Sequence, residues 1–309
     1  MKAYIWSRLL QFIPTMFGIT LLAFALLFLA PGDPATVRVS AGGITPDPAV
    51  VKEMQVRMGL DKPFFVQYAS WLGDFLTGDA GTSYVTDEPV STLIVRALPY
   101  TVDIALLSMM LTLIVSVPVG LYSAAGRNTG GDYLFRGFSF VSNAVPNFMT
   151  AMLLLFVFSY RLNWIPVLSS GRYIGLILPT ATLTVVMSAR YIRQVRAAVL
   201  DELEKPYVAG LRSRGVSERN ILYRNVLKNV MMTVITLTGV SVGSLLGGTV
   251  IVETVFNRPG LGMLLMDSIS SRDYPTVQAV VVWLSAVYML VTLAADISYR
   301  YVNPKLRKG

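Results

Sequence analysis

The sequence predicts an all-α integral membrane protein with six transmembrane helices. Of its 309 residues 54% are hydrophobic and only 14% are charged, a balance too apolar for an ordinary soluble domain. Apolar segments of about the length that crosses a bilayer recur along the chain, and the fourth is the shortest. They are Leu9–Ala30, Thr101–Ala125, Phe138–Ser159, Ile174–Ala189, Thr233–Val252 and Thr276–Ala295.

The first apolar segment is expected to be a retained span. It has no small-residue cleavage site before Pro31-Gly32-Asp33-Pro34. Weak helical patterning at Pro48–Met58 and Phe64–Phe75 then predicts a small extracytoplasmic cap after the first helix. The expected organisation is 1–30 for the N-terminus and first helix, 31–99 for the cap, 100–300 for a five-helix core with a cytosolic loop at 197–232, and 301–309 for a cytosolic tail.

The distribution of charge predicts the orientation. If the N-terminus lies in the cytosol and the spans alternate, most of the 26 Lys and Arg residues face inward, while acidic residues gather outside. This positive-inside bias places both termini in the cytosol. It also accounts for the isoelectric point of about 9.7, so no nucleic-acid partner is expected.

The chain contains no Cys and no His, which removes disulfides, thiolate metal sites and the usual acid–base catalyst. We therefore expect no catalytic residue and no metal site. A membrane-embedded hydrolase would need a nucleophile with a base, or an Asp pair, inside the spans. Asp103 and Asp296 lie instead near membrane boundaries, where an interfacial carboxylate is the plain interpretation and a proton relay the alternative.

Three glycines on one face of the fifth span predict close helix packing. Gly239, Gly243 and Gly247 are spaced by four residues, and small residues let another helix approach closely in lipid. The alternative is that glycines are simply common in transmembrane helices.

A polar island at Ala197–Met232 separates the fourth and fifth apolar segments. Pro206 suits the first turn of a short helix, and Gly215 suits its end. Ser217 suits the N-cap of a second helix with an apolar face. In the first helix Tyr207, Val208 and Leu211 share a face that fits a groove in another protein; the alternative is an amphipathic helix lying on anionic lipid.

The order of residues in this island resembles the cytoplasmic loop of binding-protein-dependent ABC importer permeases, specifically the peptide/nickel group. Tyr207, Arg212, Gly215 and Ser217 match that pattern, whereas Gly210-Leu211 replaces a usual Thr-Ala. Family-like motifs occur in order along nearly the whole chain. They are Pro31-Gly32-Asp33-Pro34, Gly59-Leu60-Asp61-Lys62-Pro63, Gln67-Tyr68, Gly78-Asp79-Ala80-Gly81-Thr82-Ser83, Glu253-Thr254-Val255-Phe256, Pro259-Gly260-Leu261-Gly262, Arg272-Asp273-Tyr274-Pro275 and Asn303-Pro304-Lys305.

The resemblance implies a type I ABC importer permease fold in a bacterial or archaeal cytoplasmic (inner) membrane. It implies a second homologous permease subunit, two ABC ATPase subunits and an extracytoplasmic solute-binding protein as partners, besides the lipid bilayer. The residues it assigns to ATPase coupling are Pro206, Tyr207, Val208, Leu211, Arg212, Gly215 and Ser217. No Gly-x4-Gly-Lys-Ser/Thr phosphate loop occurs, so the chain is not expected to be an enzyme by itself or to bind a cofactor, and ATP and Mg belong to the partner chains.

Alternating access is the mechanism implied. Polar residues beside a proline, Ser142, Asn143, Pro146 and Asn147, are candidates for the translocation path; alternatively they satisfy backbone groups freed by Pro146. Glu253, Arg272 and Asp273 are candidates for an outer gate or docking surface. Arg272 and Asp273 are candidates to pair there, and a solvated turn before the sixth span is the alternative.

The substrate stays open between small peptides and nickel, as an ion or a chelate. The short loop at Tyr160–Tyr173 resembles nickel-type and short-peptide members of the group. A stand-alone secondary transporter is the main rival. It should carry charges at mid-membrane and often repeat symmetry, and neither is evident in the sequence.

Overall fold

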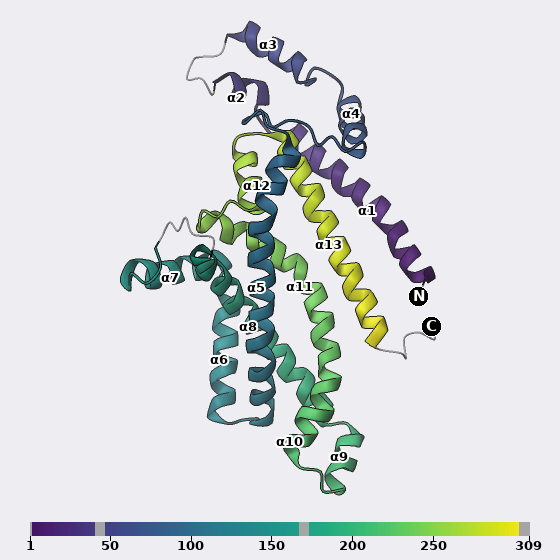
Figure 1. Ribbon diagram of the computed structural model, residues 1–309, viewed down its shortest axis with the longest axis vertical. Coiled ribbons are helices and arrows are strands. Elements are labelled where there is room, and N and C mark those ends of the chain that lie inside the picture. The colour runs from purple at the N-terminus through teal and green to yellow at the C-terminus, as the bar shows by residue number, and fades with distance from the viewer. Residues whose placement is uncertain (1, 41–46, 167–172, 303–309) are drawn as a thin grey trace. The chain divides into compact units, whose positions relative to one another are not determined.

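Helices make up almost all of the chain in the computed structural model, which describes residues 2–40, 47–166 and 173–302 (Figure 1). Five helices are long and apolar enough to cross a membrane, and one bent helix pair makes a sixth crossing if it counts as one span. This agrees with the predicted all-α class and the number of apolar segments. The tail at 303–309 and part of the Tyr160–Tyr173 loop lie outside the described residues.

The elements follow one another as helices throughout. They are α1 (Lys2–Leu29), α2 (Pro34–Ser40), α3 (Pro48–Arg57), α4 (Phe64–Leu76), α5 (Val90–Ala125), α6 (Gly130–Ala144), α7 (Asn147–Leu154), a π-helical stretch η1 (Leu155–Arg161), α8 (Ile174–Leu203), α9 (Pro206–Ser213), α10 (Glu218–Asn220), a second π-helical stretch η2 (Ile221–Val226), α11 (Leu227–Val255), α12 (Leu261–Ser270) and α13 (Tyr274–Val302).

The chain divides into two compact units. The bundle unit contains Val102–Arg258 and the described residues from Leu290 onward. The cap unit contains Lys2–Thr101 and Pro259–Met289. The chain passes between them within α5, after Arg258 and within α13.

Aromatic side chains hold the cap unit together where α4 packs on α1. The ring of Phe24 meets those of Phe64 and Tyr68 edge-on, at centroid distances of 5.3 and 5.5 Å. The hydroxyls of Thr20 and Tyr68 lie 2.9 Å apart. Edge-to-face pairs add to the free energy of burying such large rings. The helices expected at Pro48–Met58 and Phe64–Phe75 are therefore present, as α3 and α4.

Small polar residues form the contact between α5 and α8 in the bundle unit. The hydroxyls of Ser108 and Ser116, eight residues apart, donate to the backbone carbonyls of Thr180 and Ser188, also eight residues apart. Further along, a Cβ built on Gly120 would lie 2.8 Å from the Val195 side chain. Small residues repeated at helical spacing let two helices approach closely where lipid supplies no hydrophobic drive.

The third predicted span is not one straight helix. α6 ends at Ala144, and the pair α6–α7 bends by 107° at Val145 and Pro146. Proline donates no backbone hydrogen bond and disfavours helical backbone in the residue before it. Val145 is accordingly extended, with φ −89° and ψ 125°. The apolar segment Phe138–Ser159 therefore forms two helices joined by a sharp bend at Pro146, and it makes the sixth crossing if the bent pair counts as one span.

Only part of the glycine stripe on α11 lies in close contacts. A Cβ on Gly239 would overlap the side chain of Ala295 on α13, so a residue larger than glycine does not fit there. Gly247 has open space around it. The close approach lies one residue later, at Gly248, where a Cβ would meet the Leu183 side chain at 3.0 Å. Successive residues of an α-helix point about 100° apart around its axis, so Gly247 and Gly248 face different neighbours.

Candidate functional site

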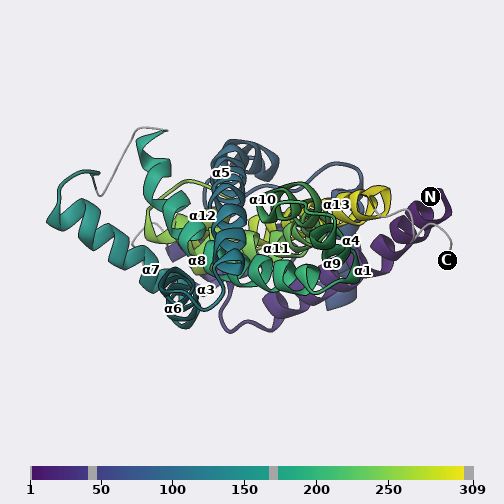
Figure 2. The same cartoon turned by 90° about the horizontal axis from the view of Figure 1, so that it is seen from below.

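α9 extends past the ends of α8 and α11, and Figures 1 and 2 both show it beside α10. It begins at Pro206 after an extended Lys205 and is followed by Gly215 in the left-handed region, with φ +74°. The predicted start and stop of this helix are therefore confirmed. Ser217 precedes α10 with extended backbone, as an N-cap residue should, although its hydroxyl makes no capping hydrogen bond.

The apolar face of α9 packs against its own chain. Val208 is 0% exposed and belongs to the core that also contains Val195, Val199, Ile221 and Val226, with Leu211 packed against it. The predicted exposed Tyr/Val/Leu face is thus wrong for Val208 and Leu211. Burying such side chains contributes about 1.5–3 kcal/mol each, and the nearest apolar surface is that of α8, η2 and α11.

A buried carboxylate fixes α9 to its neighbours. The Glu202 side chain, at the end of α8, is 8% exposed and forms an ion pair with Lys205. Its Oε1 accepts hydrogen bonds from the Tyr207 hydroxyl at 2.9 Å and from the Asn229 amide at 2.8 Å. Burial raises the pKa of Tyr207, and donation to Glu202 raises it further, so the phenol remains a donor at neutral pH. This cluster joins α8, α9 and α11.

Sequence reasoning found only part of this cluster. The negative charge of Glu202 before a helix start was visible in the sequence. Its contact with Asn229, which lies 27 residues further along the chain, was not. A carboxylate before a proline and an amide early in the next helix are too common to indicate a pair.

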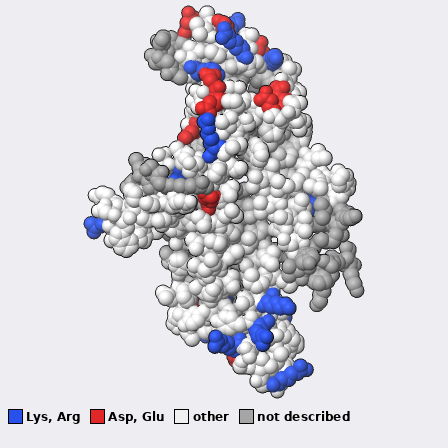
Figure 3. All heavy atoms as spheres, in the orientation of Figure 1, with Lys and Arg blue, Asp and Glu red and all other residues white. Residues whose placement is uncertain are grey.

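The outward surface of α9 consists of small and basic residues. Pro206, Ala209, Gly210 and Ser213 are exposed, and a Cβ on Gly210 would meet nothing within 4 Å. Arg212 makes two hydrogen bonds to Glu218, at 2.6 and 3.1 Å, and these raise the pKa of its guanidinium. Basic side chains gather over this end of the bundle unit (Figure 3).

A second buried carboxylate, which sequence reasoning missed, fastens α6 to α8. Asp132 is 0% exposed, and the guanidinium of Arg196 donates to both its oxygens, at 2.6 and 2.8 Å. The Ser123 hydroxyl and the Asn128 backbone N–H complete the set, at 2.6 and 3.0 Å. Nothing in the spacing of Arg196 from Asp132 indicates a pair, since 64 residues separate the two.

The candidate path residues lie around the break between α6 and α7. The Asn143 amide donates to the Ser139 carbonyl of its own helix at 2.7 Å. The Asn147 amide lies 3.5 Å from where a Cβ of Gly248 would stand, so this side chain faces α11. Ser142 is half-buried and Pro146 is exposed. Asn147 therefore faces α11, whereas Asn143 is exposed and bonded to its own helix.

Asp273 and Arg272, two of the three outer candidates, make contacts other than the pair that was expected. Asp273 is 3% exposed and accepts from the Ser83 hydroxyl at 2.5 Å, the Tyr84 backbone N–H at 2.9 Å and the Thr276 hydroxyl at 2.7 Å. The Arg272 guanidinium contacts the Pro31 carbonyl instead. The predicted Arg272–Asp273 pair is therefore wrong, and so is the solvated turn.

Arg272 and Glu253 are both held by packing within their own units. The Arg272 guanidinium fills the space beside Gly32, whose φ of +105° suits glycine alone. Glu253, in the last turn of α11, is 0% exposed and so offers no surface to a docking protein. Asp103 and Asp296 are half-buried and make electrostatic or hydrogen-bonding contacts. Burial of a charged residue is decided by the packing around it, which one-dimensional spacing does not reveal.

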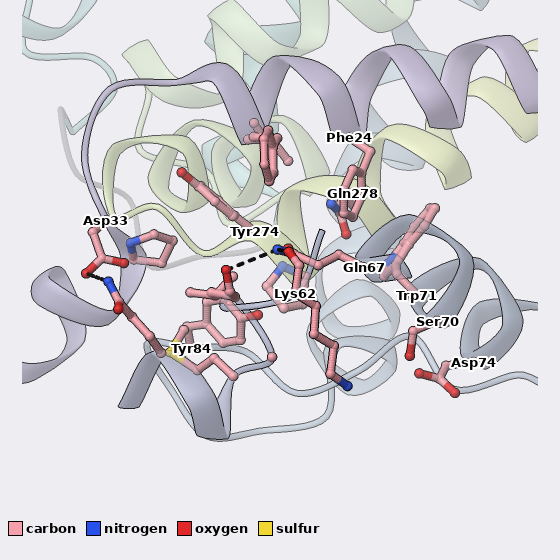
Figure 4. A pocket seen from close by; sticks show the side chains of 18 of the residues that line it. Phe24, Asp33, Lys62, Gln67, Ser70, Trp71, Asp74, Tyr84, Tyr274 and Gln278 are labelled. Atoms are coloured by element: carbon pink, nitrogen blue, oxygen red, sulfur yellow. Dashed lines mark hydrogen bonds between the residues drawn. The ribbon is translucent and has the colours of Figure 1, made fainter. Parts of the chain in front are cut away.

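A cavity of about 370 Å³ opens within the cap unit (Figure 4). Phe24 of α1, Lys62, Trp71 and Asp74 line it, and the indole N–H of Trp71 has no hydrogen-bond partner among the described residues. Burial alone would raise the pKa of Asp33 at its edge. Hydrogen bonds from Thr36, Gln55 and two backbone N–H groups outweigh burial, and the pKa is lowered.

No group of three or more carboxylates, imidazoles or thiols suited to a metal ion occurs among the residues that the structure describes.

Comparisons with known proteins place this arrangement in a family. The family model described as "Binding-protein-dependent transport system inner membrane component" matches residues 116–308, and its N-terminal companion matches residues 1–105. The Glutathione transport system permease protein GsiC of Pectobacterium atrosepticum is 36% identical over 307 residues, which is 99% of each chain. The protein of the same name from Escherichia coli K12 is 35% identical over 307 residues, again 99% of each chain.

A solved structure supports the fold. The inward-facing MetNI methionine ABC transporter matches with a TM-score of 0.59 and 17% identity, over 69% of this chain and 97% of that chain. The predicted type I importer permease fold is therefore confirmed, and the apolar helices agree with a multi-pass protein of the inner membrane. The chain belongs to the binding-protein-dependent ABC importer permeases of the peptide/nickel family, whose ATPases and substrate-binding proteins are separate chains.

Proposed function

We propose that this permease subunit admits a small peptide of the glutathione class by alternating access, driven by ATPases that dock on α9. The substrate class is supported by relatives that are 35–36% identical over 99% of their length and carry glutathione in their names. Nickel, as an ion or a chelate, was equally open from the sequence. The relatives favour the peptide.

One observation supports α9 as the coupling element: its apolar face is sealed into the bundle unit. Val208 shares a core with residues of α5, α8, η2 and α11, and Tyr207 is bonded to Glu202. A push on the outside of α9 must therefore move these helices together, because packed interiors shift as units. Coupling to an ATPase would require this packed group to have a second arrangement that the ATPases favour.

The docking surface is accordingly the outer face of α9. Its exposed residues have small side chains: Pro206, Ala209, Gly210 and Ser213. Arg212 is held in place by its hydrogen bond to Glu218. Gly210 replaces a residue that is usually Thr in the family, so a partner groove fitted to this chain would lie closer to the backbone here. Val208, Leu211 and Gly215 contribute by shaping and fixing the helix, and Ser217 by starting the next one.

The remaining assignments follow the family. Two ATPase subunits would hold ATP and Mg, and a second homologous permease would complete the path, with Ser142, Asn143, Pro146 and Asn147 near it. The solute-binding protein would dock outside, where Arg272 and the Asp273 cluster hold the cap unit in a fixed shape. Both termini would then lie in the cytosol, as the charge bias predicts, and this chain would catalyse nothing itself.

ATPase activity of the reconstituted complex tests the substrate. We expect glutathione or short peptides, presented with the binding protein, to stimulate hydrolysis in liposomes, and nickel chelates to leave it at the basal rate. Stimulation by nickel chelates alone would overturn the peptide proposal. Transport that persists after the ATPases are removed would instead favour a stand-alone secondary transporter.

A matched pair of glycine variants tests the docking face. Gly210→Trp places a large ring on the outside of α9, where its Cβ meets nothing of its own chain. We expect it to abolish co-purification of the ATPases while the permease folds normally. Gly73→Trp, at an equally open position on α4, is the control and should retain the ATPases. Full retention by Gly210→Trp would place the docking surface elsewhere.

A further inference from the structure

The proposed function does not use a groove of about 440 Å³ in the bundle unit. It lies between the first half of α6 and α8, and its volume falls in the range of about 300–1,000 Å³ that small ligands occupy. Aromatic and basic side chains line it together. They are Tyr133, Phe135, Arg136 and Phe140 from α6, and Arg193 and Arg196 from α8.

Two of the three arginines carry uncompensated charge. Arg196 is neutralised by its paired contacts with Asp132. Arg136 and Arg193 are exposed and make no ion pair within the described part of the chain, and Arg136 lies 5.5 Å from the ring centre of Tyr133. Guanidinium groups bind phosphate oxygens strongly and in a planar, two-point geometry. The groove is therefore electrostatically suited to an anion.

A buried hydroxyl in the groove also lacks a partner. Ser139 is 2% exposed, lines the groove, and its Oγ has no hydrogen bond to any described residue. Most buried polar atoms in proteins are hydrogen-bonded, so a group left without a partner needs an explanation. A ligand oxygen in the groove would supply one.

The groove lies on the α9 side of the bundle unit. The α5–α6 turn approaches the turn before α9, since Arg127 and Glu204 are 3.8 Å apart. At 1.5 Å per residue, Arg136 stands about 9 Å along α6 from its start at Gly130, and Phe140 about 15 Å. Beyond the arginines α6 exposes Phe138, Phe140 and Val141. Basic side chains followed along α6 by apolar ones would suit a lipid, whose anionic headgroup would meet the arginines and whose acyl chain would meet the apolar side chains.

We propose that this groove holds an acidic phospholipid of the leaflet that borders α9. Its phosphate lies between Arg136 and Arg193, within reach of the Ser139 hydroxyl, and an acyl chain runs along Phe140. The lipid would brace α6 against α8 beside the Asp132–Arg196 pair. This rests on the proposed function only for identifying the leaflet as cytosolic.

Native mass spectrometry of the detergent-purified complex tests the proposal, with phosphatidylglycerol and phosphatidylcholine as probes. We expect selective retention of phosphatidylglycerol. Arg136→Gln/Arg193→Gln should weaken its binding roughly thirtyfold, because each basic residue near a membrane surface contributes about a factor of five. Arg219→Gln/Arg224→Gln removes two exposed charges outside the groove and should change retention little.

Two further experiments, on the unaltered chain, test the proposal even if the double variant folds poorly. Photoactivatable phosphatidylglycerol should label residues 133–140 of the unaltered chain. Inorganic phosphate at millimolar concentration should not displace it, since the acyl chain contributes to binding. Equal retention of both lipids, or displacement by phosphate, would overturn the proposal. So would efficient crosslinking of Phe140→Cys, the sole cysteine in that variant, to the second permease subunit, which would make the groove a subunit interface.

None of these outcomes depends on which solute is transported or on ATPase docking at α9. Loss of lipid selectivity would therefore leave the proposed function intact, and a failure of peptide-stimulated hydrolysis would leave the lipid site intact.

Discussion

Two buried carboxylates, Asp132 in the bundle unit and Asp273 in the cap unit, fasten helix ends by different chemistry. Asp132 accepts hydrogen bonds from the charged guanidinium of Arg196, from one hydroxyl and from one backbone N–H. Asp273 accepts hydrogen bonds from two hydroxyls and one backbone N–H, which are all uncharged donors. Both join residues distant in sequence, 64 and 190 positions apart.

The difference lies in how much each cluster depends on one partner. A buried ion pair that loses one member leaves an uncompensated charge in a medium of low dielectric constant. When a carboxylate is held by several neutral donors, a mutation that removes one donor costs only about the free energy of one hydrogen bond. The Asp132 cluster therefore depends chiefly on one cation, Arg196, whereas the Asp273 cluster is shared among three neutral donors.

The largest effect is expected from Arg196→Met. It leaves Asp132 buried without its cation and should lower the free energy of unfolding by about 3–5 kcal/mol. Thermal unfolding of the purified permease, with chemical denaturation as a second measure, checks this. Asp132→Asn/Arg196→Met is the matched control and should recover part of the loss, because no buried charge remains. If the two variants are equally destabilised, the contact acts through packing and the comparison fails.

A smaller loss is expected from Asp273→Ala in the cap unit. Two hydroxyls and a backbone N–H lose their acceptor, which should cost about 1–3 kcal/mol. Ser83→Ala removes one donor and should cost about 1 kcal/mol. Hydrogen exchange of residues 82–89 and of the first turn of α13 would localise the effect. A Ser83→Ala effect as large as that of Asp273→Ala would mean that this cluster also depends on one contact.

Tyr207→Phe extends the comparison to the Glu202 cluster, which mixes both kinds of partner. The phenol hydroxyl is one of three donors and lies on a part-exposed side chain, so we expect a loss of only about 0.5–1.5 kcal/mol. The functional effect should be larger than the structural one. ATP hydrolysis by the complex should respond less to loaded binding protein while the basal rate stays near normal. Unchanged stimulation would show that the Tyr207–Glu202 hydrogen bond is not needed for α9 to transmit the signal.

The last effect, which is absent at neutral pH, is a pH dependence in the cap unit. Burial, with the nearby charge of Asp273, raises the pKa of Tyr84 to about 12. The unfolded chain ionises near pH 10, so the contribution of Tyr84 to stability is present below pH 10 and lost as the pH rises towards 12. The difference in Tm between the unaltered chain and Tyr84→Phe, followed from pH 9 to 11.5, should show this slope. A constant difference would mean that the tyrosine is not ionised on unfolding.

Sequence reasoning succeeded where one segment carries its own signal. The Pro206 start and Gly215 stop of α9 depend on backbone conformations that neighbouring residues impose, and both were confirmed. It failed for Val208 and Arg272. An apolar helix face is equally compatible with a partner's groove and with the protein's own core, and adjacent opposite charges need not point at each other.

The helical class, the apolar segments long enough to cross a membrane, the bounds of α9 and the family could all be read from the order of residues. Hydrophobic length, proline and glycine positions and motif order are local properties, readable along one dimension. Packing between distant segments set the size of the bend at Pro146, which is 107°, and turned Val208 inward. It also brought Asp132 to Arg196 and Asp273 to Ser83. Those outcomes depend on which distant surfaces become neighbours, because burial and charge pairing are properties of the packed chain and not of any segment.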